Sequence, residues 1–220
     1  MSSRELIVRY ARERMKLGVF VPLALVMAGL GRLTRRQVDG WTGERPAVEF
    51  AIATLTALLL MLAFRVWDDL EDRERDAREH PQRVTVVADS MSPLVALALA
   101  LGASGVLLVV VGPRSPSRLG AVAIALAVLG AWYRMRPKPA PAAFNAHVVL
   151  LKYPLIAFAV SPVGPPPGAL ASLYLVLCAY EIVDDPALRA SIAARWIAVS
   201  EFALVSAIIA TATLFKGTIP

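Results

Sequence analysis

The chain has 220 residues, 57% of them hydrophobic and 18% charged, and its mean hydropathy is +0.61. This composition is too apolar for an ordinary soluble domain and predicts an integral membrane protein. Orientation signals and anionic lipid explain the net charge of +6 better than a nucleic-acid partner, which we do not expect. The single cysteine, Cys178, excludes an intrachain disulfide and a cysteine zinc site, and we expect a buried, inert thiol.

The first fifteen residues are basic and no small-residue cleavage site follows them, so we expect a cytoplasmic lead-in rather than a signal peptide. Apolar runs behind it predict membrane-spanning helices. The seven predicted spans are Leu17–Leu33, Ala47–Val66, Ser92–Gly112, Leu119–Tyr133, Phe144–Ser161, Gly168–Val183 and Ile197–Phe215. The expected fold is an all-α integral membrane protein, a single bundle of about seven transmembrane helices forming one domain over residues 1–220.

The positions of lysine and arginine between these runs predict the orientation of the bundle. With the N-terminus inside, the inner segments hold fifteen of them and the outer segments seven. We therefore expect the N-terminus and the segments after the second and sixth spans to be cytoplasmic and the C-terminus to be outside. The expected location is the inner membrane of a bacterium.

An acidic stretch follows the second span and contains Asp68, Asp69, Asp72 and Asp76. Asp68, Asp72 and Asp76 are spaced i, i+4, i+8, which places them on one helical face. Each like-charged pair on such a face costs a few tenths of a kcal/mol. Such a face favours a bound cation, and Mg²⁺ prefers carboxylate oxygens and often shares them with a phosphate ligand. The alternative is a solvated face that is salt-bridged to the interleaved arginines.

A second acidic cluster ends the sixth span, where Glu181, Asp184 and Asp185 precede Pro186. The i, i+3 and i, i+4 spacings again share a helical face, and the proline ends or kinks the helix. Both clusters are expected on the same side, so they can face each other across a cavity. Together they suit a diphosphate that is bridged to carboxylates by two or more Mg²⁺ ions and held by cationic donors.

These motifs resemble those of the UbiA superfamily of intramembrane prenyltransferases. Asp68-Asp69-x-x-Asp72-x-x-x-Asp76 is similar to the family's first aspartate-rich motif, which usually begins with Asn. His80-Pro81-Gln82-Arg83 resembles the Pro-x-Arg element that follows that motif, and Glu181-x-x-Asp184 resembles the start of the second motif. Tyr133, with Pro137 and Lys138, resembles the family's Tyr/Pro/Lys loop.

The resemblance implies a Mg²⁺-dependent enzyme in the lipid bilayer that acts on an isoprenoid diphosphate, whose ionisation leaves an allylic cation. The implied catalytic and metal-binding groups are Asp68, Asp69, Asp72, Asp76, Glu181, Asp184 and Asp185, with Asp69 catalytic only. The implied diphosphate donors are Arg83, Tyr133, Lys138, Asn145 and Lys152. The chain departs from the family in having about seven spans instead of nine. It also has Leu188 where the second motif usually ends in Asp.

Other side chains support or compete with this interpretation. Lys152 lies inside the fifth span. A contact with the diphosphate or with an acidic neighbour is favoured there over a side chain that only snorkels along the helix. His147 is too isolated along the chain to indicate a metal site. Aromatic residues near the span ends suit interfacial belts, but some can line a prenyl pocket and stabilise carbocations through their ring faces. The pocket candidates are Phe64, Trp67, Tyr153, Tyr174 and Tyr180.

Two chemistries are compatible with an enzyme of this kind. A terpene cyclase needs an apolar pocket with aromatic walls, because the substrate's own double bond is the acceptor. A prenyltransferase needs a second, polar pocket for an aromatic or lipid acceptor. The spans carry few polar side chains near the membrane centre, so we favour cyclisation. A divalent-cation transporter is a remote alternative, because it would need acidic residues deep in the bundle.

Overall fold

The computed structural model describes residues 1–38, 46–111, 116–137, 142–161 and 164–215, and only the backbone in 33–38, 186–187 and 212–215. Every regular element in these ranges is a helix, which confirms the all-α prediction. The helices are α1 (Ser3–Arg14), α2 (Leu17–Val38), α3 (Pro46–Glu71), α4 (Arg73–Glu79), α5 (Val84–Val87), α6 (Ser92–Val111), α7 (Pro116–Met135), α8 (Ala142–Leu150), α9 (Lys152–Val160), α10 (Pro167–Asp184), α11 (Pro186–Ala190) and α12 (Ile192–Phe215).

Six segments of the described chain are long and apolar enough to cross a membrane. They are α3, α6, α7, the pair α8–α9, α10 and α12, and they coincide with six of the seven predicted spans. The predicted first span corresponds to α2, which meets α1 at an angle of 69°. Counting that bent pair as one crossing gives seven spans, so the bundle has six or seven.

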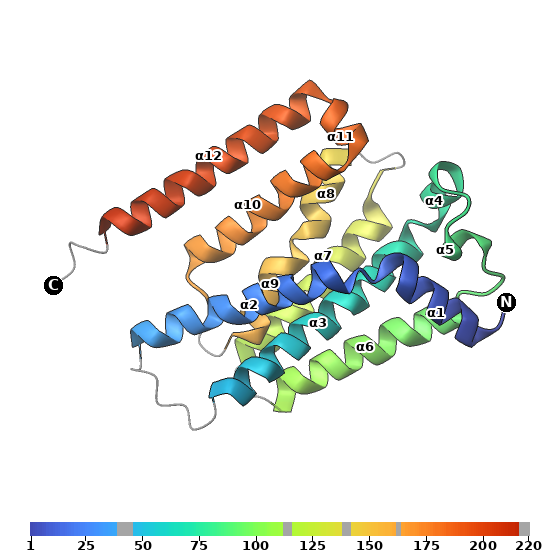
Figure 1. Ribbon diagram of the computed structural model, residues 1–220, viewed down its shortest axis with the longest axis horizontal. Helices are drawn as coiled ribbons and strands as arrows, with labels where there is room; N and C mark the ends of the chain where they lie inside the picture. The colour runs from blue at the N-terminus through green and yellow to red at the C-terminus, as the bar shows by residue number, and fades with distance from the viewer. Residues whose placement is uncertain (39–45, 112–115, 138–141, 162–163, 216–220) are drawn as a thin grey trace.

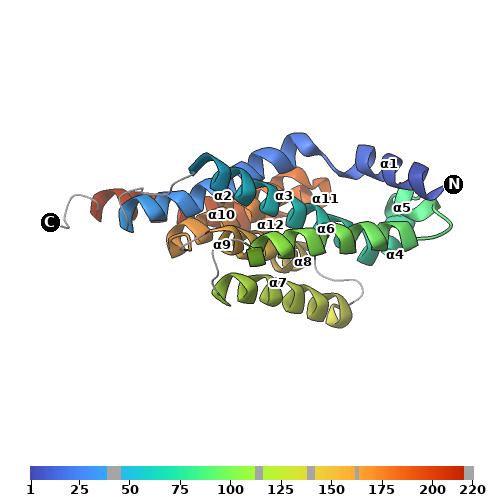
Figure 2. The ribbon, with the colours of Figure 1, turned by 90° about the horizontal axis from the view of Figure 1, so that it is seen from below.

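The bundle is arranged around α3 and α9. Helix α3 packs against α2, α6 and α9, while α9 also contacts α7 and α10. Helix α12 covers α10 on the far side from α3, and α7 forms a separate layer (Figures 1 and 2). The C-terminal ends of α3 and α10 lie at the same end of the bundle as α1 (Figure 1). Both acidic clusters therefore belong to one end of the molecule.

Small residues allow the helices of the core to approach closely, while large apolar side chains lie on the outer surface. Leu99, Leu107 and Val111 of α6 are exposed, as suits a helix that faces lipid. On the inner face of α6, a Cβ atom at Gly105 would lie 2.8 Å from Leu60 Cδ2. Leu60 is itself 2% exposed, so α3 and α6 can approach this closely only because residue 105 has no side chain.

Two helix breaks differ from the sequence prediction. The fifth predicted span is continuous, but the structure divides it into α8 and α9 at Leu151. Pro154 explains the break, because it has no N–H to donate to the carbonyl of Leu150 and its ring crowds that carbonyl. The first acidic stretch was predicted to lie on one helical face, but α3 ends at Glu71 and α4 starts at Arg73, with Asp72 between them.

We predict that Gly105→Ala destabilises the protein. The added methyl group must displace the buried Leu60 side chain, and overpacking of this kind costs about 1–3 kcal/mol. Thermal unfolding in detergent measures the effect. Gly102→Ala, on the same helix, is the matched control, because its Cβ atom would lie 3.7 Å from Ala63 Cβ, an ordinary contact. Equal melting temperatures for the two variants would show that α3 and α6 do not pack as described.

Candidate active site

The four aspartates of the first acidic stretch lie where α3 passes into α4, and each pairs with a cation. Asp68 and Asp69 are buried at the end of α3, and Asp76 is buried in α4. Several of the partners come from other helices of the bundle. Buried carboxylates need such partners, because an unpaired charge in a low-dielectric interior costs several kcal/mol.

Asp68 is the centre of a group of buried side chains. One carboxylate oxygen accepts a hydrogen bond from the hydroxyl of Tyr133 on α7, and the other pairs with the ammonium of Lys152 at the start of α9. Lys152 is only 3% exposed, so it does not snorkel to solvent. Two of the five predicted diphosphate donors, Tyr133 and Lys152, thus converge on the first aspartate of the motif.

Asp69 instead holds α1 against the bundle. Arg14 binds both of its carboxylate oxygens at 2.6 and 3.0 Å, and Tyr10 donates its hydroxyl at 2.8 Å. Arg65 adds an ion pair at 3.3 Å from one turn earlier on α3. Burial raises the pKa of Tyr10, so its hydroxyl stays protonated and continues to donate. Both oxygens of Asp69 are occupied in this arrangement and link α1 to α3, and its catalytic role stays a prediction.

Asp72 and Asp76 pair with arginines closer to the surface. Asp72 accepts from Arg136 at 2.8 Å and from Arg75 at 2.9 Å. One oxygen of Asp76 pairs with Arg83 of the segment that resembles the Pro-x-Arg element, and its other oxygen is buried with no hydrogen-bond partner. Asp76 Oδ2 is therefore an available ligand atom.

The second acidic cluster divides into one inner and two outer carboxylates. Glu181 is half-buried and lies close enough to Arg65 and Lys152 to interact with them electrostatically. Within the described chain, no hydrogen bond joins its carboxylate to another side chain. Asp184 is exposed, and Asp185 accepts a hydrogen bond from the Leu188 N–H at the start of α11. Glu181 thus interacts with two cations that also pair with the first motif.

The predicted pocket aromatics form one group near Asp68 and two separate positions. Phe64 stacks on Trp67 at a centroid distance of 6.1 Å, and Trp67 meets Tyr133 at 5.7 Å. The Lys152 ammonium lies 5.4 Å from the ring centroid of Tyr153. The structure does not bring the other two to this group. Tyr174 packs against His147, and Tyr180 is exposed.

Asn145 and Lys138 are the remaining predicted diphosphate donors. Asn145 accepts from the Trp132 indole at 2.9 Å and lies 3.5 Å from Arg136, so it belongs to the outer shell around Asp72. Lys138 lies outside the described residues.

The sequence analysis does not identify four other side chains that pair with these aspartates, three arginines and one tyrosine. Arg65 has a local signal, because it precedes Asp69 by four residues on one helix. Arg136 lies in the basic stretch after α7 and contacts Asp72. Tyr10 and Arg14 have no local signal, because they precede Asp69 by 59 and 55 residues.

The donor set fits Mg²⁺ if a diphosphate supplies part of the coordination. Among the described residues, the aspartates do not bring three ligand atoms within 4.8 Å of one another. Mg²⁺ on a substrate phosphate commonly needs only one or two carboxylates, the rest being phosphate and water oxygens. The unpartnered oxygen of Asp76 and the carboxylates of Asp68, Asp72 and Glu181 would supply these.

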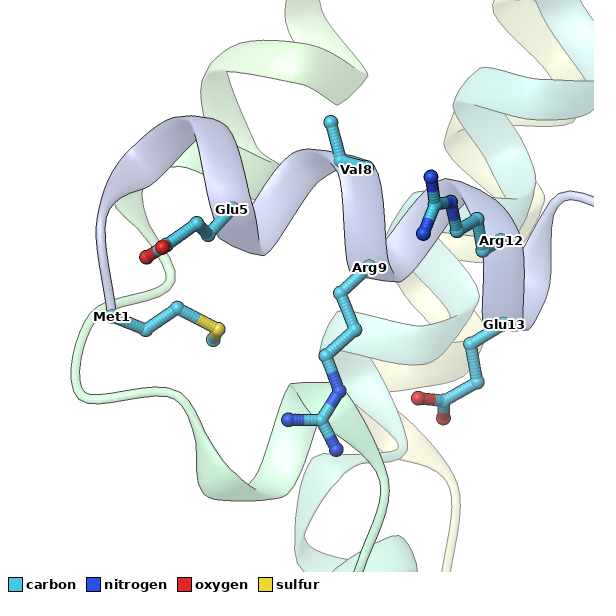
Figure 3. A pocket seen from close by; sticks show the side chains of 6 residues that line it. All are labelled: Met1, Glu5, Val8, Arg9, Arg12 and Glu13. Carbon is cyan, nitrogen blue, oxygen red and sulfur yellow. The ribbon is translucent and has the colours of Figure 1, made fainter.

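A pocket of about 660 Å³ lies along α1, and none of these aspartates lines it (Figure 3). It is lined by Met1, Glu5, Val8, Arg9, Arg12 and Glu13. Both acidic and basic side chains line it, so it does not suit an apolar prenyl chain. Comparisons of the chain with protein-family models, curated proteins and solved structures find no match.

We predict that Asp69→Ala loosens α1. It leaves the half-buried Arg14 without its carboxylate, and breaking one side of a buried pair costs up to about 3–5 kcal/mol. Limited trypsin digestion should then cut within α1, and the melting temperature should fall. The double variant Arg14→Met/Asp69→Leu should recover part of the loss, because residue 14 then carries no unpaired charge, while Arg65 and the Tyr10 hydroxyl still lack their partner.

Asp89→Asn is the control for this experiment. Asp89 is exposed and pairs with the N-terminal amine, so its loss should change stability little. Equal losses for the Asp69 and Asp89 variants would contradict the anchoring role of Asp69.

Proposed function

We propose that the protein is a Mg²⁺-dependent intramembrane enzyme of the UbiA type that ionises an isoprenoid diphosphate and cyclises the resulting carbocation. The observation that carries this proposal is the buried group of Asp68, Tyr133 and Lys152, which joins α3, α7 and α9. Ionisable residues inside a membrane bundle are costly and are kept mainly where they act on a substrate or an ion. Carboxylates beside cationic donors are the chemistry that a metal-bridged diphosphate requires.

Bound Mg²⁺ would supply neutralisation of the charge that develops on the leaving diphosphate. The residues that would hold it are Asp68, Asp72, Asp76 and Glu181. The cations that pair with these carboxylates in the structure would be the donors to phosphate oxygens. Lys152 and Arg136 suit this role, because each is held beside an aspartate of the motif from elsewhere in the bundle, Lys152 from α9 and Arg136 from the segment after α7. Tyr133 adds a hydroxyl donor on the same side as Asp68.

The surroundings of Asp68 favour intramolecular capture of the cation. Phe64, Trp67 and Tyr133 form consecutive ring contacts beside it, and ring faces attract cations. The neighbouring core residues Leu60, Met61 and Leu129 are apolar and offer nothing that would orient a polar acceptor. In a water-poor interior, an alkene of the same chain can attack before water does.

Turnover without an acceptor tests the proposal. Purified protein should release diphosphate from geranyl, farnesyl or geranylgeranyl diphosphate with Mg²⁺ and form cyclic hydrocarbons or alcohols, which gas chromatography detects. We expect Asp68→Ala and Asp72→Ala to lower turnover more than about a hundredfold, because metal-mediated stabilisation of a leaving group is worth several kcal/mol. Asp72 is the cleaner of the two sites, since it is less buried than Asp68.

Glu74→Ala is the matched control, because Glu74 is an exposed carboxylate in the same stretch. Comparable losses in all three variants would indicate general destabilisation. A prenylated aromatic or quinone-precursor acceptor, with no cyclic product in its absence, would reject cyclisation in favour of a transferase. No diphosphate release with any substrate would reject the enzyme.

We further propose that the end of the bundle that carries α1 and both acidic clusters faces the cytoplasm. The fifteen-to-seven distribution of lysine and arginine supports this orientation. Reporters inserted after α6 and after α7 should then report opposite sides of the membrane, outside and inside respectively. The same location for both would contradict a crossing by α7 and this orientation.

A further inference from the structure

A second polar cluster lies within the bundle, and the proposed reaction does not use it. His147 of α8, Cys178 of α10 and Glu201 of α12 bring one ligand atom each within 4.8 Å of one another. Cys178 and Glu201 are buried and His147 is half-buried. Within their helices, His147 and Cys178 lie about one to two turns, and Glu201 about two to three turns, from the start of α8, the end of α10 and the start of α12, respectively. His147 is thus not isolated, contrary to the sequence analysis.

The side chain of Glu201 shows that the cluster is incomplete by itself. One carboxylate oxygen lies 2.7 Å from His147 Nε2. The other oxygen is buried and has no hydrogen-bond partner, and the residue is only 6% exposed. A buried carboxylate oxygen without a partner is unfavourable, and it needs an explanation such as a bound ion.

The hydrogen bonds of His147 orient its ring for metal binding. Nδ1 lies 2.7 Å from the carbonyl oxygen of Ala143, which can only accept, so Nδ1 carries a proton. Metal-binding histidines usually donate their second ring N–H to a group of this kind, which directs Nε2 at the ion. Tyr174 donates to the His147 carbonyl at 3.0 Å and packs edge-on against its ring, so the imidazole is held from two sides.

One proton must lie between His147 Nε2 and Glu201 Oε1, because neither a bare imidazole nitrogen nor a carboxylate can donate. A metal ion can take its place. Binding would displace this proton and the thiol proton of Cys178, and would leave imidazole, carboxylate and thiolate as ligands. In a tetrahedral zinc site the ligand atoms are about 3.3–3.8 Å apart, as follows from bond lengths of about 2.0–2.3 Å. Shifts of about 1 Å or less would therefore close the cluster on an ion.

We propose that His147, Cys178 and Glu201 form a binding site for a zinc-class divalent cation that ties α8, α10 and α12 together. One nitrogen, one sulfur and one oxygen ligand suit Zn²⁺ rather than Mg²⁺, which prefers oxygen alone. Three protein ligands also leave a fourth position for water. Small apolar residues, among them Ala179, Ala194 and Ala198, are buried where α10 and α12 pack, and they let these helices approach. This site is independent of the proposed enzymatic function.

Metal binding by the purified, chelator-stripped protein in detergent tests this proposal. In excess Mg²⁺, which occupies oxygen-only sites, we expect one Zn²⁺ per chain by equilibrium dialysis. Co²⁺ alone should give the near-ultraviolet absorption of a thiolate-bound ion, which a carboxylate site lacks. Zn²⁺ should also raise the melting temperature, because it binds only the folded state.

Cys178→Ser changes one atom and should abolish the thiolate absorption and weaken Zn²⁺ binding more than about tenfold. His147→Gln should weaken it similarly, whereas His80→Gln, the change at the chain's other histidine, should not. Absence of stoichiometric Zn²⁺ binding in the folded wild type would overturn the proposal and leave a metal-free His147–Glu201 ion pair. Equal Zn²⁺ affinity in wild type and Cys178→Ser would overturn it as well, and would place the ion elsewhere.

Discussion

A carboxylate inside a membrane bundle stays ionised only if a cation or a hydrogen-bond donor accompanies it. This requirement organises the end of the molecule that carries both acidic clusters. Asp68 and Asp69 are adjacent in sequence and therefore point in different directions from α3. Each recruits its own partners, Asp68 from α7 and α9 and Asp69 from α1. The positions of three other helices thus depend on two consecutive aspartates.

The same requirement explains why a broken helix lies at the centre of the bundle. A proline in a membrane helix frees a carbonyl, which is tolerated where protein surrounds it. Pro154 interrupts the span between α8 and α9. At the break, the Leu151 N–H donates to the carbonyl of Val148, three residues earlier instead of the four of an α-helix, at 3.3 Å. The break places Lys152 at the first residue of α9, where it reaches Asp68. An irregularity of the backbone therefore positions the cation of the candidate active site.

Helix α10 takes part in two polar centres of different chemistry. Glu181 lies toward Arg65 and Lys152, in surroundings of oxygen ligands and cationic donors. Cys178, three residues earlier, lies toward His147 and Glu201, in a mixed nitrogen, sulfur and oxygen set. Hard cations that bridge phosphates suit the first centre and borderline cations suit the second. If both proposals hold, α10 would contribute to two ion sites that do not compete for the same cation.

The sequence by itself determined the all-α membrane class, the approximate positions of the spans and the first acidic stretch. These features are local, because twenty consecutive apolar residues or an i, i+4 spacing can be recognised in one segment. Glu201 can also be recognised as a candidate site residue from its own segment, because it is the only acidic residue in the last apolar run. Pro154 had one as well, since its missing N–H predicts the break between α8 and α9.

Only the tertiary structure decided which charges meet. Arg14 reaches Asp69 across 55 residues, and His147 reaches Glu201 across 54. Which helices become neighbours depends on close approaches such as that of Gly105 to Leu60, and a pattern within one segment does not contain that information. Asp68 and Asp69 are adjacent aspartates of one motif, and the sequence does not distinguish them. Their different roles follow from the partners that the surrounding helices place beside them, because in a low-dielectric interior the partner determines what a charge can do.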